Sequence, residues 1–384
     1  MSVYFDANAT TPLRSQARRV LERALTDFWQ NPSSPFRAGG RVQRQLEEAR
    51  TVAAELLGER GEGSLVILSG ATEGHNALFS WAARRAERGV QRRGVLLSAI
   101  EHPAALEAAR EWFPAEDVRI CPVNRQGLVD PEDWAHRLRE FRPGLAVLMA
   151  ANNETGVIQP WREVGEICRQ AGVPLHCDAV QLPGKASLEG LAQIPFYLLS
   201  GHKFGGPKGI GLLRVPVEEN DFHGQRGGEQ EGGRRAGTEN VPSWLAMVEA
   251  LKEALAEKET AAQQARYRDA FEEHLEEILP GVQMVGRESP RLANTSFLIM
   301  PVGDNLRWVR LLDRAGFAVS TGSACATGKE GPSPVLQAMG YAPEEARRAL
   351  RISSLPSATE EDWIALAGTM DDLFRRKIKP EEGR

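Results

Sequence analysis

The chain has 384 residues, of which 42% are hydrophobic, and carries a formal net charge of −5 at pH 7. This length can bury a large core and fits one large domain with a smaller one. The acidic balance argues against direct nucleic-acid binding, which needs a basic domain, and no apolar run approaches the roughly 20 residues that span a bilayer.

The N-terminal stretch MSVYFDANATTPLRSQ has no basic region followed by an apolar run, so we expect no signal peptide. The four cysteines are Cys121, Cys168, Cys177 and Cys325, and none forms a CxxC pair. This spacing disfavours a disulfide framework and a zinc site, so we expect no metal. Reduced thiols are typical of a cytoplasmic protein, which is the location we expect.

Short apolar runs recur along the first half of the chain, and amphipathic segments separate several of them. The runs are 64–68, 94–100, 145–150, 173–177, 196–200 and 210–215. Between them, EGHNALFSWAARRAER and PWREVGEICRQAG have helical periodicity. Apolar strands that alternate with helices predict an α/β fold with a mainly parallel sheet covered on both faces.

The pattern changes after about residue 243, where a single charged helix is predicted over 243–279. We interpret this helix as a solvated connector to a smaller C-terminal domain, in which NTSFLIM and GFAVST supply strands. We therefore expect a large domain over 15–255 and a small one over 256–384. The N-terminal segment, 1–14, is expected to pack with the small domain.

Polar residues follow several of the predicted strands. In open α/β sheets, ligands bind beyond the carboxyl ends of the strands. SGATEGHN follows the first run and opens a helix, whose N–H groups and Thr72 hydroxyl suit a phosphate. The later runs are followed by His102, Asn153, Asp178 with Gln181, and Lys203.

Pyridoxal phosphate uses all of these groups. A carboxylate such as Asp178 keeps its ring nitrogen protonated, so that the ring can accept electrons. His102 can stack on the ring, and Asn153 or Gln181 can donate to its phenolic oxygen. No single one of these residues would be specific, since each type is common at strand ends.

Two lysines compete to bond the cofactor aldehyde, Lys203 and Lys208. Lys203 directly ends a strand, whereas Lys208 follows a proline in the glycine-rich turn GGPKGIG. We therefore favour Lys203. The turn fits neither the P-loop pattern GxxxxGK[ST] nor GxGxxG.

Taken together, the motifs resemble those of the cysteine desulfurases, pyridoxal-phosphate enzymes of the class-V aminotransferase group. The resemblance runs from Tyr4 to about Arg351 through YFDANATTP, NPSSPFRAGG, SGATEGHN, EHPA, NNETGVIQP, HCDAVQLPGK, SGHKFGGPKGIG, RAGTENVP and STGSACATG. It implies a fold-type-I homodimer with a seven-stranded type of sheet, a smaller α+β domain and active sites at the subunit interface.

The same resemblance implies roles for individual residues. Lys203, His102 and Cys325 would be catalytic. The cofactor would be bound by Ala71, Thr72, His102, Asn153, Asp178, Gln181, Ser200, His202 and Lys203, with Thr238 reaching the phosphate in the neighbouring subunit. Arg351 would bind the substrate carboxylate by a bidentate fork, and Asn31 is a weaker candidate for that pocket.

The expected reaction converts L-cysteine to L-alanine and leaves the sulfur on Cys325 as a persulfide. Cys325 lies among small residues in TGSACATGKEGPSP, which predicts an exposed loop, and Lys329 could favour its thiolate. The persulfide would pass to an acceptor protein, either a scaffold for iron–sulfur cluster assembly or a thiolation carrier.

Some features depart from the family or leave other functions open. RISSLPS stands where the family usually continues RFSLGR, so part of the substrate pocket differs. RGGEQEGGRRAGT is basic enough to suggest RNA contact, but a loop over the site is preferred. The alternatives are a selenocysteine lyase, an aminotransferase or a kynureninase-like hydrolase on the same scaffold, and a non-catalytic protein that keeps the fold. A transaminase would not need Cys325.

Overall fold

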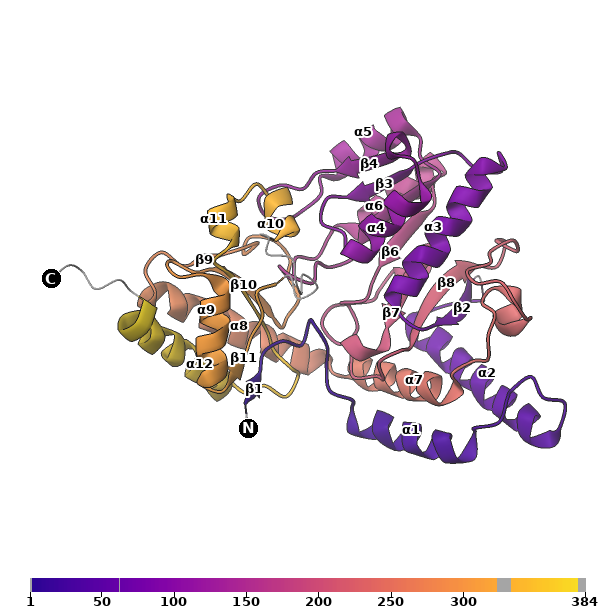
Figure 1. Ribbon diagram of the computed structural model, residues 1–384, viewed down its shortest axis with the longest axis horizontal. Helices are drawn as coiled ribbons and strands as arrows, with labels where there is room; N and C mark the ends of the chain where they lie inside the picture. Colours follow the sequence, from indigo (N-terminus) through magenta and orange to yellow (C-terminus); the bar gives the residue numbers. More distant parts are fainter. Residues whose placement is uncertain (1, 62, 323–332, 379–384) are drawn as a thin grey trace.

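The structure is a computed structural model that describes residues 2–61, 63–322 and 333–378. A seven-stranded sheet occupies its larger part, in the order β2-β8-β7-β6-β5-β3-β4 (Figure 1). Its strands are β2 (Gly63–Leu68), β3 (Val95–Ser98), β4 (Val118–Cys121), β5 (Leu145–Met149), β6 (Leu175–Asp178), β7 (Phe196–Ser200) and β8 (Gly211–Pro216). The pairings among β3 to β7 are parallel, and β8 is antiparallel to β7 and β2.

Each of the six predicted apolar runs is a strand of this sheet, which confirms the expected α/β fold. The prediction missed β4, which lies at the sheet edge. Arg119 and Ile120 in this strand are exposed, so no apolar run marks it in the sequence.

Helices cover both faces of the sheet, as the sequence predicted. One face packs against α3 (Ala71–Glu87) and α4 (Pro103–Trp112). The other packs against α1 (Ser15–Asp27), α2 (Arg37–Leu57), α5 (Pro131–Phe141), α6 (Trp161–Ala171) and α7 (Val241–Ala256). The strands alternate between these two cores: Leu65 and Ile67 enter one, and Val66 and Leu68 the other.

The predicted connector helix is two helices, α7 and α8 (Lys258–Ile278), separated at Glu257, where φ is −89° and ψ is 39°. The interpretation as a solvated connector is wrong. Trp244, Met247 and Leu251 of α7 are buried in the core beside the large sheet. Most of the charged side chains that suggested a solvated helix are exposed, but Arg268 and Glu272 of α8 are buried.

Two smaller sheets lie beside the large one. β10 (Thr295–Ile299) pairs antiparallel with β12 (Ala349–Ser353) and β9 (Gln283–Met284), and β1 (Val3–Tyr4) pairs parallel with β11 (Phe317–Ala318). The remaining α-helices are α9 (Asn305–Arg314), α10 (Pro334–Ala338), α11 (Pro343–Ala346) and α12 (Glu360–Leu373). Shorter turns of helix are η1 (Ala115–Asp117), η2 (Leu191–Gln193), η3 (Gly201–Lys203), η4 (Gln230–Gly233) and η5 (Phe374–Ile378).

These sheets and helices form the smaller α+β part that the sequence predicted. The N-terminal segment contacts both parts. Asn8 N donates to Ser353 Oγ at 3.1 Å, and Thr11 N donates to the His202 carbonyl at 2.9 Å. The predicted domain boundaries, 1–14, 15–255 and 256–384, stay a prediction.

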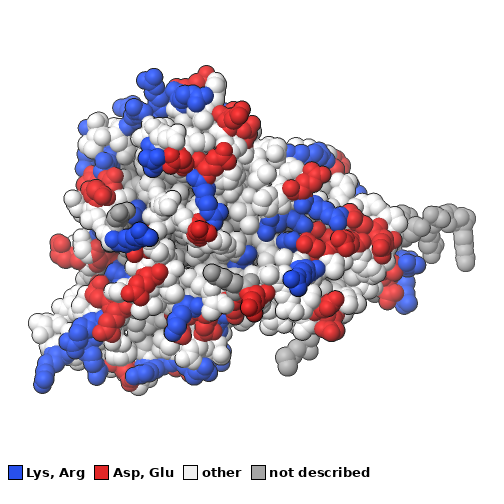
Figure 2. All heavy atoms as spheres, turned by 180° about the vertical axis from the view of Figure 1, so that it is seen from behind, with Lys and Arg blue, Asp and Glu red and all other residues white. Residues whose placement is uncertain are grey.

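Acidic and basic side chains are interspersed over the face shown in Figure 2 (Figure 2). Among the described residues, no group of three or more His, Cys, Asp or Glu is arranged to hold a metal ion. In that same part of the chain, no helix combines the length and apolar character needed to cross a membrane.

Candidate active site

A cavity of about 580 Å³ lies beyond the carboxyl ends of the central parallel strands. Nine of the predicted site residues line it: Ala71, Thr72, His102, Asn153, Asp178, Gln181, Ser200, His202 and Lys203. These residues come from separate strand ends, so the parallel sheet is what brings them together. A larger cleft of about 1140 Å³ next to the end of α2 contains none of the predicted residues.

The N-terminus of α3 forms one wall of the cavity. The first N–H groups of a helix have no partner within the helix, and the helix dipole favours an anion there. Close backbone packing shapes this wall, because a Cβ on Gly211 would lie 2.9 Å from the Cα of Gly70. Ser200 and Thr72 add hydroxyls at the cavity surface. The wall therefore suits a phosphate group.

Positive charge surrounds the same wall. Lys203 and Lys208 both line the cavity; Lys185 lies nearby, but burial lowers its pKa well below the usual value. Burial, followed by Lys203, Lys208 and Lys185, lowers the pKa of His202 to about 4. The electrostatic environment thus favours an anionic ligand.

The carboxylate of Asp178 is held ionised although it is buried. Burial alone would raise its pKa, but the hydrogen bond and the charge interaction with His75, the hydrogen bond from the Val180 N–H and the charge interaction with His102 lower that pKa to about 2. His75 Nε2 lies 3.3 Å from Asp178 Oδ2, and Val180 N donates to Asp178 Oδ1 at 3.0 Å. A fixed negative charge therefore faces the cavity at neutral pH.

The sequence analysis missed His75. It lies in SGATEGHN, the segment interpreted as a phosphate-binding helix start, but its side chain reaches Asp178, 103 positions away in the chain. Nothing in the local sequence indicates that contact. Only its place one turn into α3, beside the cavity wall, could have drawn attention to it.

His102 is the N-cap of α4, and its Nδ1 accepts a hydrogen bond from Ala104 N at 3.1 Å. Burial lowers its pKa, with Asp178 acting in the opposite direction and His75 and Lys203 adding to the decrease. An accepting Nδ1 and a lowered pKa describe a neutral imidazole at neutral pH. Such a ring can stack on an aromatic ligand without adding charge.

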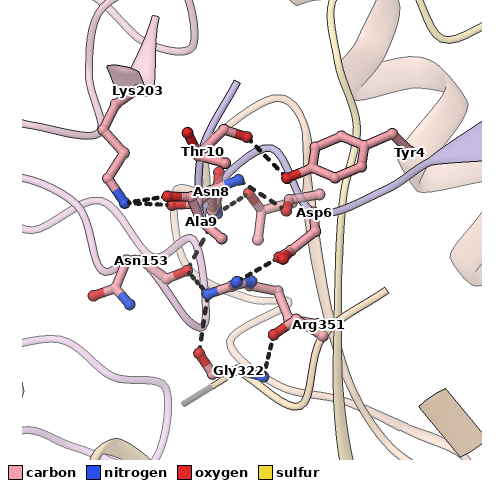
Figure 3. A network of polar contacts seen from close by, with 12 residues as sticks. Tyr4, Asp6, Asn8, Ala9, Thr10, Asn153, Lys203, Gly322 and Arg351 are labelled. Carbon is pink, nitrogen blue, oxygen red and sulfur yellow. Dashed lines mark hydrogen bonds and ion pairs between the residues drawn. The ribbon is translucent and has the colours of Figure 1, made fainter. Parts of the chain in front are cut away.

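The amine of Lys203 meets the N-terminal segment. Its Nζ donates to the carbonyls of Asn8 at 2.8 Å and Ala9 at 2.9 Å (Figure 3). Gln181 Nε2 also donates to the Asn8 carbonyl, at 3.0 Å. Lys203 thus lies in η3, directly after β7, with its amine fixed at the cavity by backbone oxygens.

Arg351 lies on β12 and does not line the cavity, although it contacts the cavity wall. Its Nη2 pairs with Asp6 Oδ1 at 2.6 Å, and its Nη1 donates to the carbonyls of Asn153 and Gly322 at 2.9 and 3.0 Å. Figure 3 shows the amide side chain of Asn153 directed away from this guanidinium. Arg351 Nε is buried, with no hydrogen-bond partner among the described residues.

The other predicted residues lie apart from the cavity or outside the described chain. Asn31 and Thr238 are exposed and do not line the cavity of this single chain. Cys325 and Lys329 lie outside the described residues.

Glu101 is a second buried carboxyl group, to which the sequence analysis gave no role. Its Oε1 accepts hydrogen bonds from Ser98 Oγ and Met149 N, while its Oε2 has no partner within the described part of the chain. Burial raises its pKa to about 8. Glu101 therefore stays protonated at neutral pH, next to the ionised Asp178.

The residues of this cavity fit pyridoxal phosphate. A helix N-terminus and hydroxyls suit the phosphate, an ionised carboxylate suits the ring nitrogen, a neutral imidazole suits the ring face, and an amine suits the aldehyde. The donor and acceptor types thus match each part of this cofactor.

Comparisons with known proteins give three kinds of similarity. The aminotransferase class-V family model matches residues 3–366. A cysteine desulfurase of Trichormus azollae is 34% identical over 377 residues, which cover 97% of this chain and 93% of that protein. The solved NifS-like protein of Rickettsia africae ESF-5 has a TM-score of 0.87 and 27% identity, and covers 98% of this chain and 100% of that one. A solved structure of SspA in complex with cysteine has a TM-score of 0.78 and 26% identity, with 93% and 100% covered.

The raised pKa of Glu101 gives a testable pH dependence of stability. Between pH 4.5 and 8 the unfolded carboxyl group has lost its proton while the folded one keeps it, so folding becomes less favourable as pH rises. Relative to Glu101→Gln, the wild-type free energy of unfolding should fall across this window, by at most about 1.4 kcal/mol per pH unit. Denaturant titrations at several pH values measure the difference. Glu107→Gln, at an exposed carboxyl group of α4, is the control. If the difference from wild type does not change with pH for Glu101→Gln, as expected for the control, Glu101 is not protonated in the folded protein.

Proposed function

The chain belongs to the class-V aminotransferase family and is a pyridoxal-phosphate-dependent cysteine desulfurase, and we propose which of its residues bind the cofactor, bind the substrate and receive the sulfur. The observation that carries the proposal is the convergence of nine predicted residues on one cavity. A selenocysteine lyase or an aminotransferase would use the same cofactor, but the full-length relatives are cysteine desulfurases.

The cofactor, when bound, supplies an aldehyde for a lysine and a ring that takes up the charge released at the substrate Cα. Lys203 would bond the aldehyde in the resting enzyme and, once released, carry the Cα proton on its Nζ. Asp178 would hold the ring-nitrogen proton, and His102 would lie against the ring. Support comes from the fixed amine of Lys203 and the lowered pKa of Asp178.

Arg351 would bind the carboxylate of L-cysteine. Its guanidinium is already held in place by Asp6 and two backbone carbonyls, and the buried Nε has no partner among the described residues. A guanidinium fixed in this way can offer remaining N–H groups to a substrate carboxylate at little further entropic cost. Asn31 would contribute to the same pocket, with support from sequence resemblance alone.

Cys325 would receive the sulfur. The other cysteines of the chain, Cys121, Cys168 and Cys177, are buried. Burial raises the thiol pKa of Cys121 and Cys168 to about 12, and the thiol pKa of Cys177 is raised well above its usual value. Because only a thiolate attacks sulfur efficiently, none of these thiols suits the reaction. Cys325 is the remaining candidate.

The persulfide would pass to an acceptor protein, either an iron–sulfur scaffold or a thiolation carrier. One full-length relative is the cysteine desulfurase IscS of Methanosarcina thermophila. We also propose that the enzyme works in the cytoplasm, where thiols stay reduced.

Lys203 should be the residue that bonds the cofactor. Lys203→Ala should lose borohydride-dependent covalent attachment of pyridoxal phosphate and more than 99% of activity, whereas Lys208→Ala should keep the attachment. Peptide mass spectrometry after reduction identifies the modified lysine. Attachment at Lys208 instead would mean that the amine has been assigned to the wrong residue.

Cys325→Ser should still bind the cofactor and L-cysteine, because neither event uses this thiol. Persulfide formation should be lost, because a serine hydroxyl cannot form a persulfide. Alanine and sulfide release are measured together, with the persulfide mapped after one turnover. The matched control is Cys168→Ser, which removes a buried thiol and should lower stability more than turnover. A persulfide on any other cysteine would refute the assignment.

We propose a homodimer in which Thr238 reaches the partner's cofactor phosphate. Thr238 is exposed in the single chain, and Trp29 and Phe36 leave 71% and 55% of their surface exposed. Sedimentation should show a dimer, and Trp29→Glu should weaken it at least tenfold by placing a charge in an apolar contact. Ile364→Glu, at a residue 60% exposed on α12, should leave it unchanged. A fully active wild-type monomer would contradict the proposal.

A further inference from the structure

Three buried side chains form a continuous chain behind the cavity: His176, His75 and Asp178. His176 Nε2 lies 3.1 Å from His75 Nδ1, and His75 Nε2 lies 3.3 Å from Asp178 Oδ2. Both histidines are fully buried, and their rings meet edge-on at 78° with centroids 5.1 Å apart. The chain joins α3 to β6, and it ends on the carboxylate that faces the cavity.

The hydrogen-bond chemistry fixes the proton positions along this chain. An ionised carboxylate only accepts, so the proton between His75 and Asp178 belongs to His75 Nε2. A neutral His75 then has a bare Nδ1, which must accept from Nε2–H of His176. This leaves His176 Nδ1 as a bare acceptor; that atom makes no hydrogen bond of ordinary geometry in the described residues, although the backbone of Phe196 interacts with the His176 ring.

The opposite arrangement is less favourable. It would place a proton on His176 Nδ1, where no acceptor lies within ordinary hydrogen-bond geometry in the described structure, and it would make His75 cationic. Burial lowers the pKa of His176 to about 3, so this residue does not supply a second charge. In the neutral chain each hydrogen bond has one donor and one acceptor, and Asp178 carries the one charge of the three residues.

The other groups around the chain do not replace its hydrogen bond. Phe79 lies beside His75 on the same helix, and His102 at the start of α4 interacts electrostatically with both His75 and Asp178. Glu101 and Cys177 also interact with Asp178, but both are uncharged at neutral pH. Apart from His75, the hydrogen bond to Asp178 in the described residues comes from Val180 N.

We propose that His75 is a positioning residue that holds the Asp178 carboxylate ionised and oriented toward the ring nitrogen of the cofactor, with His176 fixing the tautomer of His75. This inference rests on the proposed role of Asp178. Neither histidine touches the cavity, so both act through Asp178. Loss of the His75 donor leaves a buried carboxylate with one fewer hydrogen bond, which favours its protonated form.

The test uses the holoenzyme and two spectroscopic readouts. In wild-type protein labelled with ¹⁵N-histidine, His75 should be the neutral Nε2–H tautomer, assigned among the chain's seven histidines by the signal absent in His75→Gln. With ring-¹⁵N pyridoxal phosphate bound, the ring nitrogen should be protonated in wild type and His75→Gln, whose amide retains a donor. His75→Leu should shift this signal toward the unprotonated form and lower kcat roughly 10- to 100-fold with little change in KM. His136→Leu, at an exposed histidine of α5, is the control and should match wild type.

The outcomes separate this inference from the proposed site. If His75→Leu keeps the wild-type ring-nitrogen signal while Asp178→Asn loses it, the inference about His75 is wrong and the proposed site stands. An unchanged signal in Asp178→Asn would overturn both the site and the inference. If His75→Leu does not fold, the tautomer of wild-type His75 and the behaviour of His75→Gln decide the matter. A bare Nε2 on wild-type His75, or a His75→Gln enzyme that has lost ring-nitrogen protonation, would contradict the proposal.

Discussion

The ionised carboxylate of Asp178 is the constraint on which the rest of the site depends. An isolated charge of this kind is costly to bury, so its partners must be fixed by the fold. The Val180 N–H comes from the turn after β6, and His75 comes from the helix that also forms the phosphate wall. Glu101 stays protonated nearby, which keeps two like charges from sharing the same buried region. The electrostatics of the cavity thus follow from how α3 packs on the parallel strands.

Asn8 connects this charged region to the smaller sheets. Its carbonyl accepts hydrogen bonds from Lys203 and Gln181, its Oδ1 accepts from Lys185 at 3.2 Å, and its Nδ2 donates to Thr295 Oγ1 at 2.9 Å. The carbonyl and the side chain of Asn8 therefore connect the cavity residues Lys203 and Gln181 to β10. Two residues earlier, Asp6 pairs with Arg351. The N-terminal segment fixes the lysine and the arginine relative to each other, although it contributes few atoms to the cavity.

Much of this could be predicted from the sequence, because strand ends and helix starts carry local signals. The apolar runs, the strand-end positions of Asp178 and Lys203 and the choice of cofactor all follow from short stretches of chain. The missed features depend on tertiary packing. β4 is an exposed edge strand without an apolar run, and the break at Glu257 follows no glycine or proline. The roles of His75 and Asn8 arise from contacts between residues far apart in the sequence, which no local pattern encodes.

A crystal structure of the protein purified with pyridoxal phosphate tests the central claim most directly. The account predicts continuous density from Lys203 Nζ to the cofactor, the phosphate at the N-terminus of α3, and Asp178 within hydrogen-bond distance of the ring nitrogen. His75 should keep its contact with the opposite side of that carboxylate. Density joined to Lys208, or a cofactor whose ring nitrogen lies away from Asp178, would contradict the account.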